Sequence, residues 1–235
     1  MFAKPKEILM KVAILVDGDF YLRRHQLEFK NKLFNITDSE EKAKIIADDL
    51  MTHCLRHLDR QKDILYRIFF YDCPPLNKKL HNPISKKSLD LSKTSMYKFR
   101  TCLHKFLVRK PSMALRLGYL DENGEWKVKP RKMKELLKGT ISDSDLSDDV
   151  FYHARQKGVD MKIGLDIATL THKKLVDKII LVSGDSDFVP ASKLARREGV
   201  YFALDPMGHG IKDDLHEHID YLSTTLPSWN RQRKE

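Results

Sequence analysis

The chain has 235 residues and a formal net charge of +10 at pH 7, with 41% hydrophobic and 32% charged residues. This balance is typical of a globular protein with one sizeable core. No run of roughly 18 apolar residues is present, so no membrane-spanning helix is expected. The start of the chain lacks the apolar core of a signal peptide, and its three cysteines, Cys54, Cys73 and Cys102, match no zinc spacing. We therefore expect a cytoplasmic protein with reduced thiols.

The positive charge is concentrated in one segment of the chain. Residues Pro74 to Thr140 contain 17 Lys and Arg and 5 Asp and Glu, a local excess of +12 that exceeds the net charge of the whole chain. A basic excess of this size favours a polyanionic partner, and nucleic acid is the commonest one. The rest of the chain is slightly acidic, which makes the positions of its acids informative.

Apolar runs and helical spacing alternate along the first half of the chain. Residues 12–16 and 64–71 are predicted to be strands, and residues 39–60 have the spacing of a helix. A helix is expected over residues 88–107. Residues 113–120 and 126–128 flank Asn123-Gly124, which predicts a hairpin, and another helix is expected over residues 133–138.

The second half alternates more regularly. Helices are predicted over residues 147–157, 163–175, 188–198 and 215–222, and strands over residues 178–183 and 200–204. Strands that alternate with helices predict an α/β fold with a mainly parallel sheet and helices on both faces. We expect one domain over residues 1–235, with a basic helical and hairpin insertion at about residues 75–145.

Acidic residues follow two of the predicted strands. Asp17 and Asp19 end the first strand, and Asp185 and Asp187 follow the strand at 178–183. The carboxyl ends of parallel strands meet at one edge of a sheet, so these acids are expected to lie close together. Asp160 is predicted just before a helix and Asp166 inside it.

Clustered carboxylates repel one another unless a cation neutralises them. An oxygen-only ligand set suits Mg²⁺ or Mn²⁺, and no His or Cys lies near these acids in the sequence, which argues against zinc. Ions held in this way support phosphodiester hydrolysis. Each acid taken alone has a simpler explanation, since an Asp after a strand is commonly a turn former or a helix cap. The convergence of four or five acids at one edge favours the metal site.

Three segments resemble the NYN domain family, a branch of the PIN-like nucleases: VAILVDGDF at 12–20, KGVDMKIGLDIATL at 157–170 and KIILVSGDSDFVP at 178–190. The resemblance covers the first quarter and the last third of the chain and leaves the basic segment outside. It implies a divalent-metal-dependent ribonuclease whose ligands match Asp17, Asp166, Asp185 and Asp187, with Asp160 beside them. One departure is Phe20, where the family often has Asn.

The expected partner is RNA, and the sequence leaves open whether the chain forms a homo-oligomer. The candidate nucleic-acid-binding residues are Lys78, Lys79, Lys86, Lys87, Lys98, Arg100, Lys193 and Arg197. One rival hypothesis is a nucleic-acid-binding module with a decayed site, which Phe20 favours. Another is a phosphatase that uses Asp17-Gly18-Asp19, although Phe20-Tyr21 follows where such enzymes carry a Gly- or Thr-bearing loop.

Overall fold

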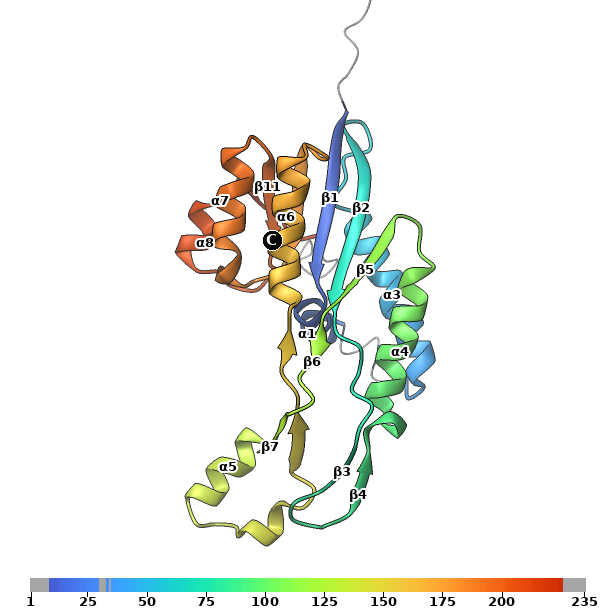
Figure 1. Cartoon of the computed structure of the whole chain (residues 1–235), viewed down its shortest axis with the longest axis vertical. Coiled ribbons are helices and arrows are strands. Elements are labelled where there is room, and N and C mark those ends of the chain that lie inside the picture. Colours follow the sequence, from blue (N-terminus) through green and yellow to red (C-terminus); the bar gives the residue numbers. More distant parts are fainter. Residues whose placement is uncertain (1–8, 30–32, 34, 226–235) are drawn as a thin grey trace, which may run out of the picture.

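The computed structural model describes residues 9–29, 33 and 35–225 and centres on a parallel sheet (Figure 1). The sheet has six strands in the order β12-β11-β10-β1-β2-β5, and each neighbouring pair is parallel. Their bounds are β1 Met10–Asp17, β2 Asp63–Asp72, β5 Met113–Leu117, β10 Lys178–Val182, β11 Tyr201–Asp205 and β12 Tyr221–Leu222. This confirms the predicted α/β class.

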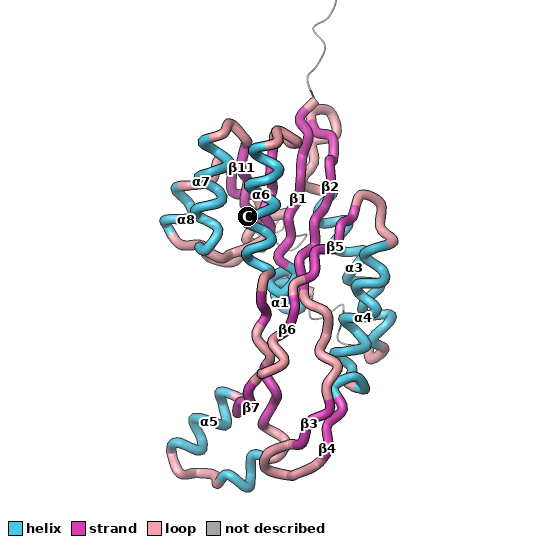
Figure 2. The backbone as a smooth tube through the Cα atoms, in the orientation of Figure 1, coloured by secondary structure: helices cyan, strands magenta, loops and turns pink. Residues whose placement is uncertain are grey.

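Helices cover both faces of the sheet (Figure 2). One face packs against α1 Gly18–Glu28, α3 Ser39–Leu55 and α4 Ser95–Val108. The other packs against α6 Val159–His172, α7 Val189–Arg197 and α8 Asp213–Glu217. Along β1, Val12, Ile14 and Val16 face the first layer, whereas Ala13 and Leu15 face the second. The central strand is apolar from Val12 to Val16 because both of its faces are buried there.

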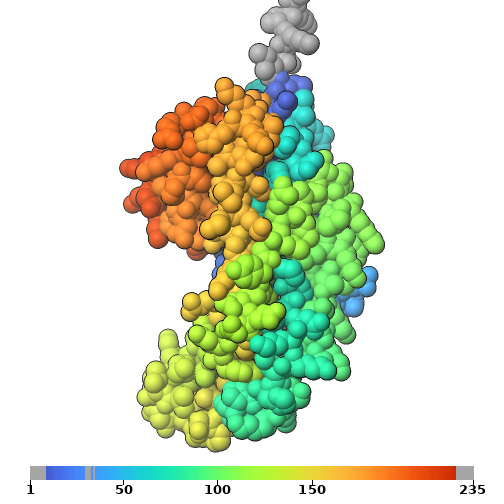
Figure 3. All heavy atoms as spheres, in the orientation of Figure 1, coloured from blue at the N-terminus to red at the C-terminus, as the bar shows by residue number. Residues whose placement is uncertain are grey.

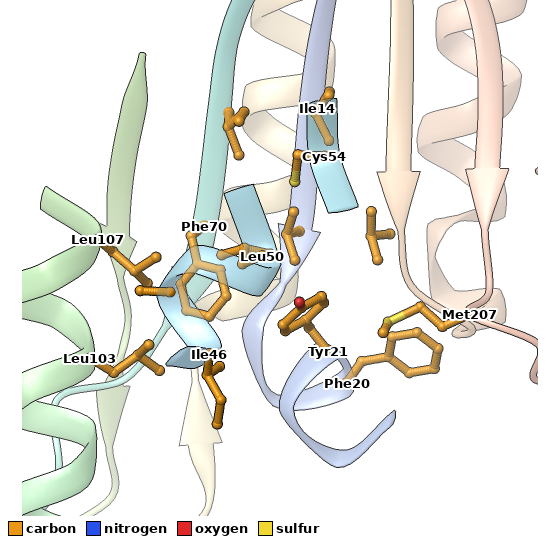
Figure 4. Packing of buried hydrophobic residues seen from close by; sticks show 14 of the residues in the cluster. Ile14, Phe20, Tyr21, Ile46, Leu50, Cys54, Phe70, Leu103, Leu107 and Met207 are labelled. Atoms are coloured by element: carbon orange, nitrogen blue, oxygen red, sulfur yellow. The ribbon is translucent and has the colours of Figure 1, made fainter. Parts of the chain in front are cut away.

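The first of these two cores is drawn in Figure 4. Tyr21 and Phe70 are buried among Leu50, Leu103 and Leu107, which come from α3 and α4. The helix α4 therefore packs against the main body, although it lies within the basic part of the sequence. The strand β5, which also lies there, pairs with β2 and forms one edge of the sheet.

Two chain excursions form a projection beyond the carboxyl edge of the sheet, which we call the arm: residues 73–94 and 118–157 (Figures 1 and 3). Its elements are β3 Lys79–His81, β4 Ser88–Asp90, β6 Tyr119–Leu120, β7 Glu125–Val128, α5 Pro130–Leu137, β8 Val150–His153, β9 Gln156–Lys157 and the short 3₁₀ helices Leu91–Lys93 and Asp143–Leu146. The excursions are tied together where Lys78 Nζ donates to the Glu122 carbonyl at 2.7 Å and Asn82 Nδ2 donates to the Ser147 carbonyl at 2.8 Å. We propose that the arm and the sheet form one domain.

Two predictions for this region are wrong. Residues 113–128 do not form a hairpin around Asn123-Gly124, since β6 pairs with β9, β7 pairs with β8, and β5 joins the main sheet. The stretch 147–157 contains strands β8 and β9 in place of the predicted helix. The reason is tertiary, because Val150 to His153 is rich in β-branched and aromatic side chains and finds a partner in β7.

The helix α1 was not predicted, and it begins directly at the end of β1. The Asp17 side chain caps it by accepting a hydrogen bond from the Phe20 backbone N–H at 3.2 Å. The cap sits where the strand ends, so the residue that closes the strand also starts the helix. The carboxylate at the strand end is thereby held at the carboxyl edge of the sheet.

Replacing Gly18 by Ala is expected to destabilise the protein by about 1–3 kcal/mol, the usual cost of overpacking. A Cβ at this position would lie 2.4 Å from the Tyr71 carbonyl oxygen and 2.8 Å from the Phe70 ring, and the Tyr71 backbone is fixed in the sheet. Urea unfolding measures the change. Gly164→Ala in α6 is the matched control: its Cβ meets nothing within 4 Å, so helix propensity should give a gain of about 0.5–1 kcal/mol. Equal effects of the two substitutions would contradict the close approach.

Candidate metal centre at the carboxyl edge of the sheet

Acids from three elements lie at the carboxyl edge of the sheet. Asp17 ends β1, and Asp185 caps the 3₁₀ helix Ser186–Phe188 that follows β10 and contains Asp187. Because β1 and β10 are neighbours with Val16 opposite Val182, their ends lie side by side. Asp160 lies in the first turn of α6 and not before the helix as predicted.

The charges of these acids act on one another. Burial is the largest cause that raises the pKa of Asp17 to about 6, and the charges of Asp160 and Asp19 raise it further, against the Phe20 N–H and Arg23. Burial also raises the pKa of Asp160, and the charges of Asp185 and Asp187 add to the effect. Carboxylates of this kind are poised to take up a cation or a proton.

Two of the carboxylates are oriented through one oxygen and leave the other open. Asp17 Oδ1 accepts from the Phe20 N–H, and Asp185 Oδ1 accepts from the Asp187 N–H at 3.0 Å. Among the described residues, no hydrogen bond to the Oδ2 atom of either side chain is found. A carboxylate held by one oxygen keeps its direction and offers the second to a ligand.

Asp166 is held by side chains from the sheet. Its Oδ2 accepts from the Tyr71 hydroxyl at 2.8 Å and from Arg116 Nε at 3.1 Å, which join α6 to β2 and β5. Both bonds use the same oxygen. Within the described part of the chain Oδ1 has no such partner, so the predicted role of Asp166 as a ligand stays a prediction that this geometry permits. The ion pair with Arg116 also offsets part of the negative charge of Asp166.

The aspartate carboxylates at the sheet edge are spaced more widely than the ligands of a preformed metal site. Among the described residues, one group of three or more candidate metal ligands has all its ligand atoms within 4.8 Å, namely His53, His57 and Asp205. Those side chains satisfy one another, since Asp205 Oδ2 accepts from His53 Nε2 at 2.8 Å and His57 Nε2 at 2.7 Å, while Oδ1 accepts from the Met207 N–H and from Thr224.

The open oxygens at the sheet edge make the acids the better fit for Mg²⁺ or Mn²⁺. These cations prefer oxygen ligands, and Mg²⁺ keeps several waters, which allow wider spacing of the carboxylates. Asp17, Asp160, Asp185 and Asp187 supply such a donor set, and no ion pair from any described Lys or Arg neutralises Asp160, Asp185 or Asp187. The fully bonded Asp205 has no oxygen left over.

Asp17→Asn is expected to stabilise the metal-free protein by about 1–2 kcal/mol at pH 7.5. The folded pKa of about 6 lies above the ordinary value of 3.8, so ionised Asp17 opposes folding. The penalty is absent well below pH 3.8, grows as the pH rises from about 4 to 6 and is complete above the folded pKa. Asn keeps the cap on α1. Urea unfolding in EDTA at pH 7.5 and pH 4 measures the gain, and a gain of the same size at both values would contradict the electrostatic cause.

The predicted nucleic-acid-binding residues fall into two groups. Lys78 and Arg100 are used inside the protein, the first on the Glu122 carbonyl and the second on Asp72 and, at 3.2 Å, on Asp19. The others are exposed: Lys79, Lys86, Lys87, Lys98, Lys193 and Arg197. Lys86 Nζ also donates to the Pro83 carbonyl, and Arg197 lies 3.9 Å from Glu198. Their contact with nucleic acid stays a prediction.

Two residues outside the predicted set lie beside the acids. Lys212 Nζ donates to the hydroxyl of Ser186, which stands between Asp185 and Asp187 in the sequence, at 3.1 Å. His209, which follows β11, has its ring 6.3 Å from that of Phe20, and both rings approach Gly184. The Phe20 ring is thus buried against the loop that carries the acids. The only sequence signal was the position of both residues after a strand.

The parallel sheet flanked by helices, with its open acidic edge, has the architecture of the PIN-like nucleases. The NYN domain family model matches residues 83–221, more than half of the chain, and the chain therefore belongs to this family. The match includes the segments 157–170 and 178–190 but not 12–20. It also takes in most of the basic segment, which corrects the expectation that this part lies outside the resemblance.

Members of this family are generally nucleases, NYN nucleases act on RNA, and PIN-like nucleases typically use divalent metal ions. No curated protein matches the chain. Among the described residues, no helix is long and apolar enough to cross a membrane.

Two solved structures resemble the chain weakly. A protein of unknown function from Vibrio parahaemolyticus is 14% identical, with a TM-score of 0.47 over 95% of this chain and 98% of that one. A Sir2 structure with the inhibitor EX-527, 2'-O-acetyl-ADP-ribose and a deacetylated p53 peptide is 11% identical, with a TM-score of 0.30 over 96% of this chain and 91% of that one. Both TM-scores are too low to define a shared fold.

Proposed function

We propose that the protein is a divalent-metal-dependent endoribonuclease. The observation that carries this is the electrostatic coupling of four acids at one sheet edge, in which Asp160 acts on Asp17 and is acted on by Asp185 and Asp187. A bound cation would relieve the repulsion between these carboxylates at neutral pH. Family membership supports a nuclease, and the excess of positive charge in residues 74–140 supports a polyanionic substrate.

Each acid has a distinct part in this proposal. Asp17, Asp185 and Asp187 would hold Mg²⁺ or Mn²⁺, with Asp166 as a further ligand through Oδ1. The ion would supply charge stabilisation at the phosphoryl oxygens and activate water. Asp160 orients the attacking water and accepts its proton, for which its raised pKa suits it. Tyr71 and Arg116 hold Asp166 in place. Lys212, which contacts Ser186, would offset the negative charge of the RNA phosphate at the site.

The rival function is a nucleic-acid-binding module with a decayed site. It is suggested by Phe20, which stands where the family often has Asn. Phe20 packs against Gly184 and His209, so it fills space beside the acids without removing any of them. Thermal unfolding with and without 1 mM-scale MnCl₂ separates the two, because a ligand that binds only the folded state raises its stability. Stabilisation of the wild type and a much smaller effect on Asp185→Asn support the nuclease. Indifference to Mn²⁺ supports the rival.

Catalysis is tested with a 5′-labelled single-stranded RNA and Mn²⁺, followed on a denaturing gel. Cleavage at internal positions is the expected result, and EDTA should stop it. Products that are shortened only from one end of the RNA would indicate an exonuclease and not an endonuclease. Turnover of a small phosphate ester without cleavage of RNA would favour the phosphatase.

A further inference from the structure

A groove of about 850 Å³ lies in the arm. It runs between the two excursions of the chain, and its walls are mainly apolar: Leu89, Leu91, Tyr97, Leu120, Phe151 and Tyr152. Phe151 is 39% exposed even though it lies on a strand. The volume is within the range of roughly 300–1,000 Å³ that is typical of pockets for small organic ligands. The groove has room for more than one flat ring.

The inner end of the groove reaches the acidic edge of the sheet. Asp19, Cys73 and Arg100 line it there, and Asp19 is two residues from Asp17. Arg100 is fixed between the buried Asp72 and the partly exposed Asp19, so ion pairs hold this end in place. A polymer lying in the groove would therefore lead directly to the acids.

Positive charge borders one side of these apolar walls. Arg155 lines the groove and is exposed, and Lys78 Nζ lies 5.7 Å from the centre of the Tyr152 ring. The first excursion of the arm, residues 73–94, supplies one wall and contains five Lys and one Asp. Apolar walls beside a positively charged excursion match a ligand with flat apolar faces and a negative backbone.

We propose that this groove binds unpaired nucleobases of single-stranded RNA next to the phosphodiester that is cleaved, with Phe151 as a stacking platform. The inference rests on the proposed nuclease function and names the form of its substrate. In a duplex the bases are paired and stacked inside, so they do not reach a groove of this kind. An apolar peptide would fit the walls but not the adjacent charge.

Binding is measured by fluorescence anisotropy with a labelled single-stranded RNA in EDTA, so that no cleavage occurs. The single strand is expected to bind at least about 10-fold more tightly than the duplex formed from it. Phe151→Ala should weaken single-strand binding about 10-fold, since stacking contributes about 1–3 kcal/mol per base. Phe151→Trp, which keeps a ring, should retain the affinity. The dependence on salt should be unchanged in both variants, because no phosphate contact is lost.

Two controls separate stacking from charge and from general damage. Tyr66→Ala removes an aromatic ring of similar exposure, 37%, at the start of β2, and should leave binding unchanged. Lys87→Gln removes an exposed cation of the arm and should reduce the slope of affinity against salt by about 1 for single strand and duplex alike.

The outcomes also distinguish the groove from the nuclease function. Unchanged affinity of Phe151→Ala, or equal binding of single strand and duplex, overturns the groove even if the wild type cleaves RNA. A single-stranded DNA that binds equally well supports the groove and assigns recognition to the bases without the 2′-hydroxyl. Single-strand binding that depends on Phe151 in a protein that never cleaves supports the groove and refutes the nuclease.

Discussion

Asp185→Asn is expected to lower RNA cleavage in Mn²⁺ by at least about 100-fold. The side chain lies at the end of β10, and its Oδ2 is open in the described structure. Asn still caps the 3₁₀ helix through its oxygen, so the local backbone should be retained. The substitution removes one negative charge from the ligand set without a change of size. Initial cleavage rates of a labelled single-stranded RNA measure the effect.

Asp213→Asn is the matched control for this experiment. Asp213 is an exposed acid in the first turn of α8, and its replacement should leave the rate within about 2-fold. Unfolding curves in EDTA should show both variants folded. Equal rates for the wild type and Asp185→Asn would refute the assignment of the site, whatever the control shows.

Asp205→Asn is expected to destabilise the protein by about 3–5 kcal/mol, since two buried hydrogen bonds to a carboxylate are lost at about 1.5–3 kcal/mol each. Asp205 is fully buried at the end of β11, and one of its oxygens accepts bonds from His53 and His57. An amide nitrogen in place of that oxygen accepts neither. His53 Nδ1 has no partner among the described residues, which suits the tautomer with its proton on Nε2.

The effect of Asp205→Asn has a definite pH dependence. Despite its burial, hydrogen bonds from His53 and His57 hold the pKa of Asp205 well below its ordinary value. A lowered pKa contributes stability that is complete above the ordinary value of 3.8 and is lost as the pH falls below it. Urea unfolding should therefore give the full difference at pH 7 and a smaller one below pH 4. A difference that widens in acid would contradict the role of the carboxylate.

The parts of the fold that the sequence predicted are those whose pattern is local. Buried parallel strands such as β1 and β10 are short apolar runs ended by turn residues, and their hydrophobic pattern does not depend on a partner. The strand β12 is only two residues long, and the arm strands β6 to β9 are short and half exposed. Their identity depends on which segment pairs with them, and this is not encoded in local spacing.

The candidate site was predicted to the same extent. Strand ends place Asp17 and Asp185 on one edge whatever the helices do. The partners of Asp166 were not predictable, because Tyr71 and Arg116 come from separate strands and meet the helix only in three dimensions. The hydrogen bonds to Asp205 from His53 in α3 and from His57 just after it were not predictable for the same reason. Contacts between residues far apart in the sequence leave no periodic pattern in it.

The two excursions of the arm each leave the sheet edge and return to it. The outer part, residues 125–153, includes β7, α5 and β8 and lies beyond the pairing of β6 with β9. Lengthening or trimming that outer part is expected to leave the spacing of the aspartates unaltered, since α6 and the strand ends that carry them lie outside it. In the proposed nuclease, the binding groove and the cleavage site can therefore be altered separately.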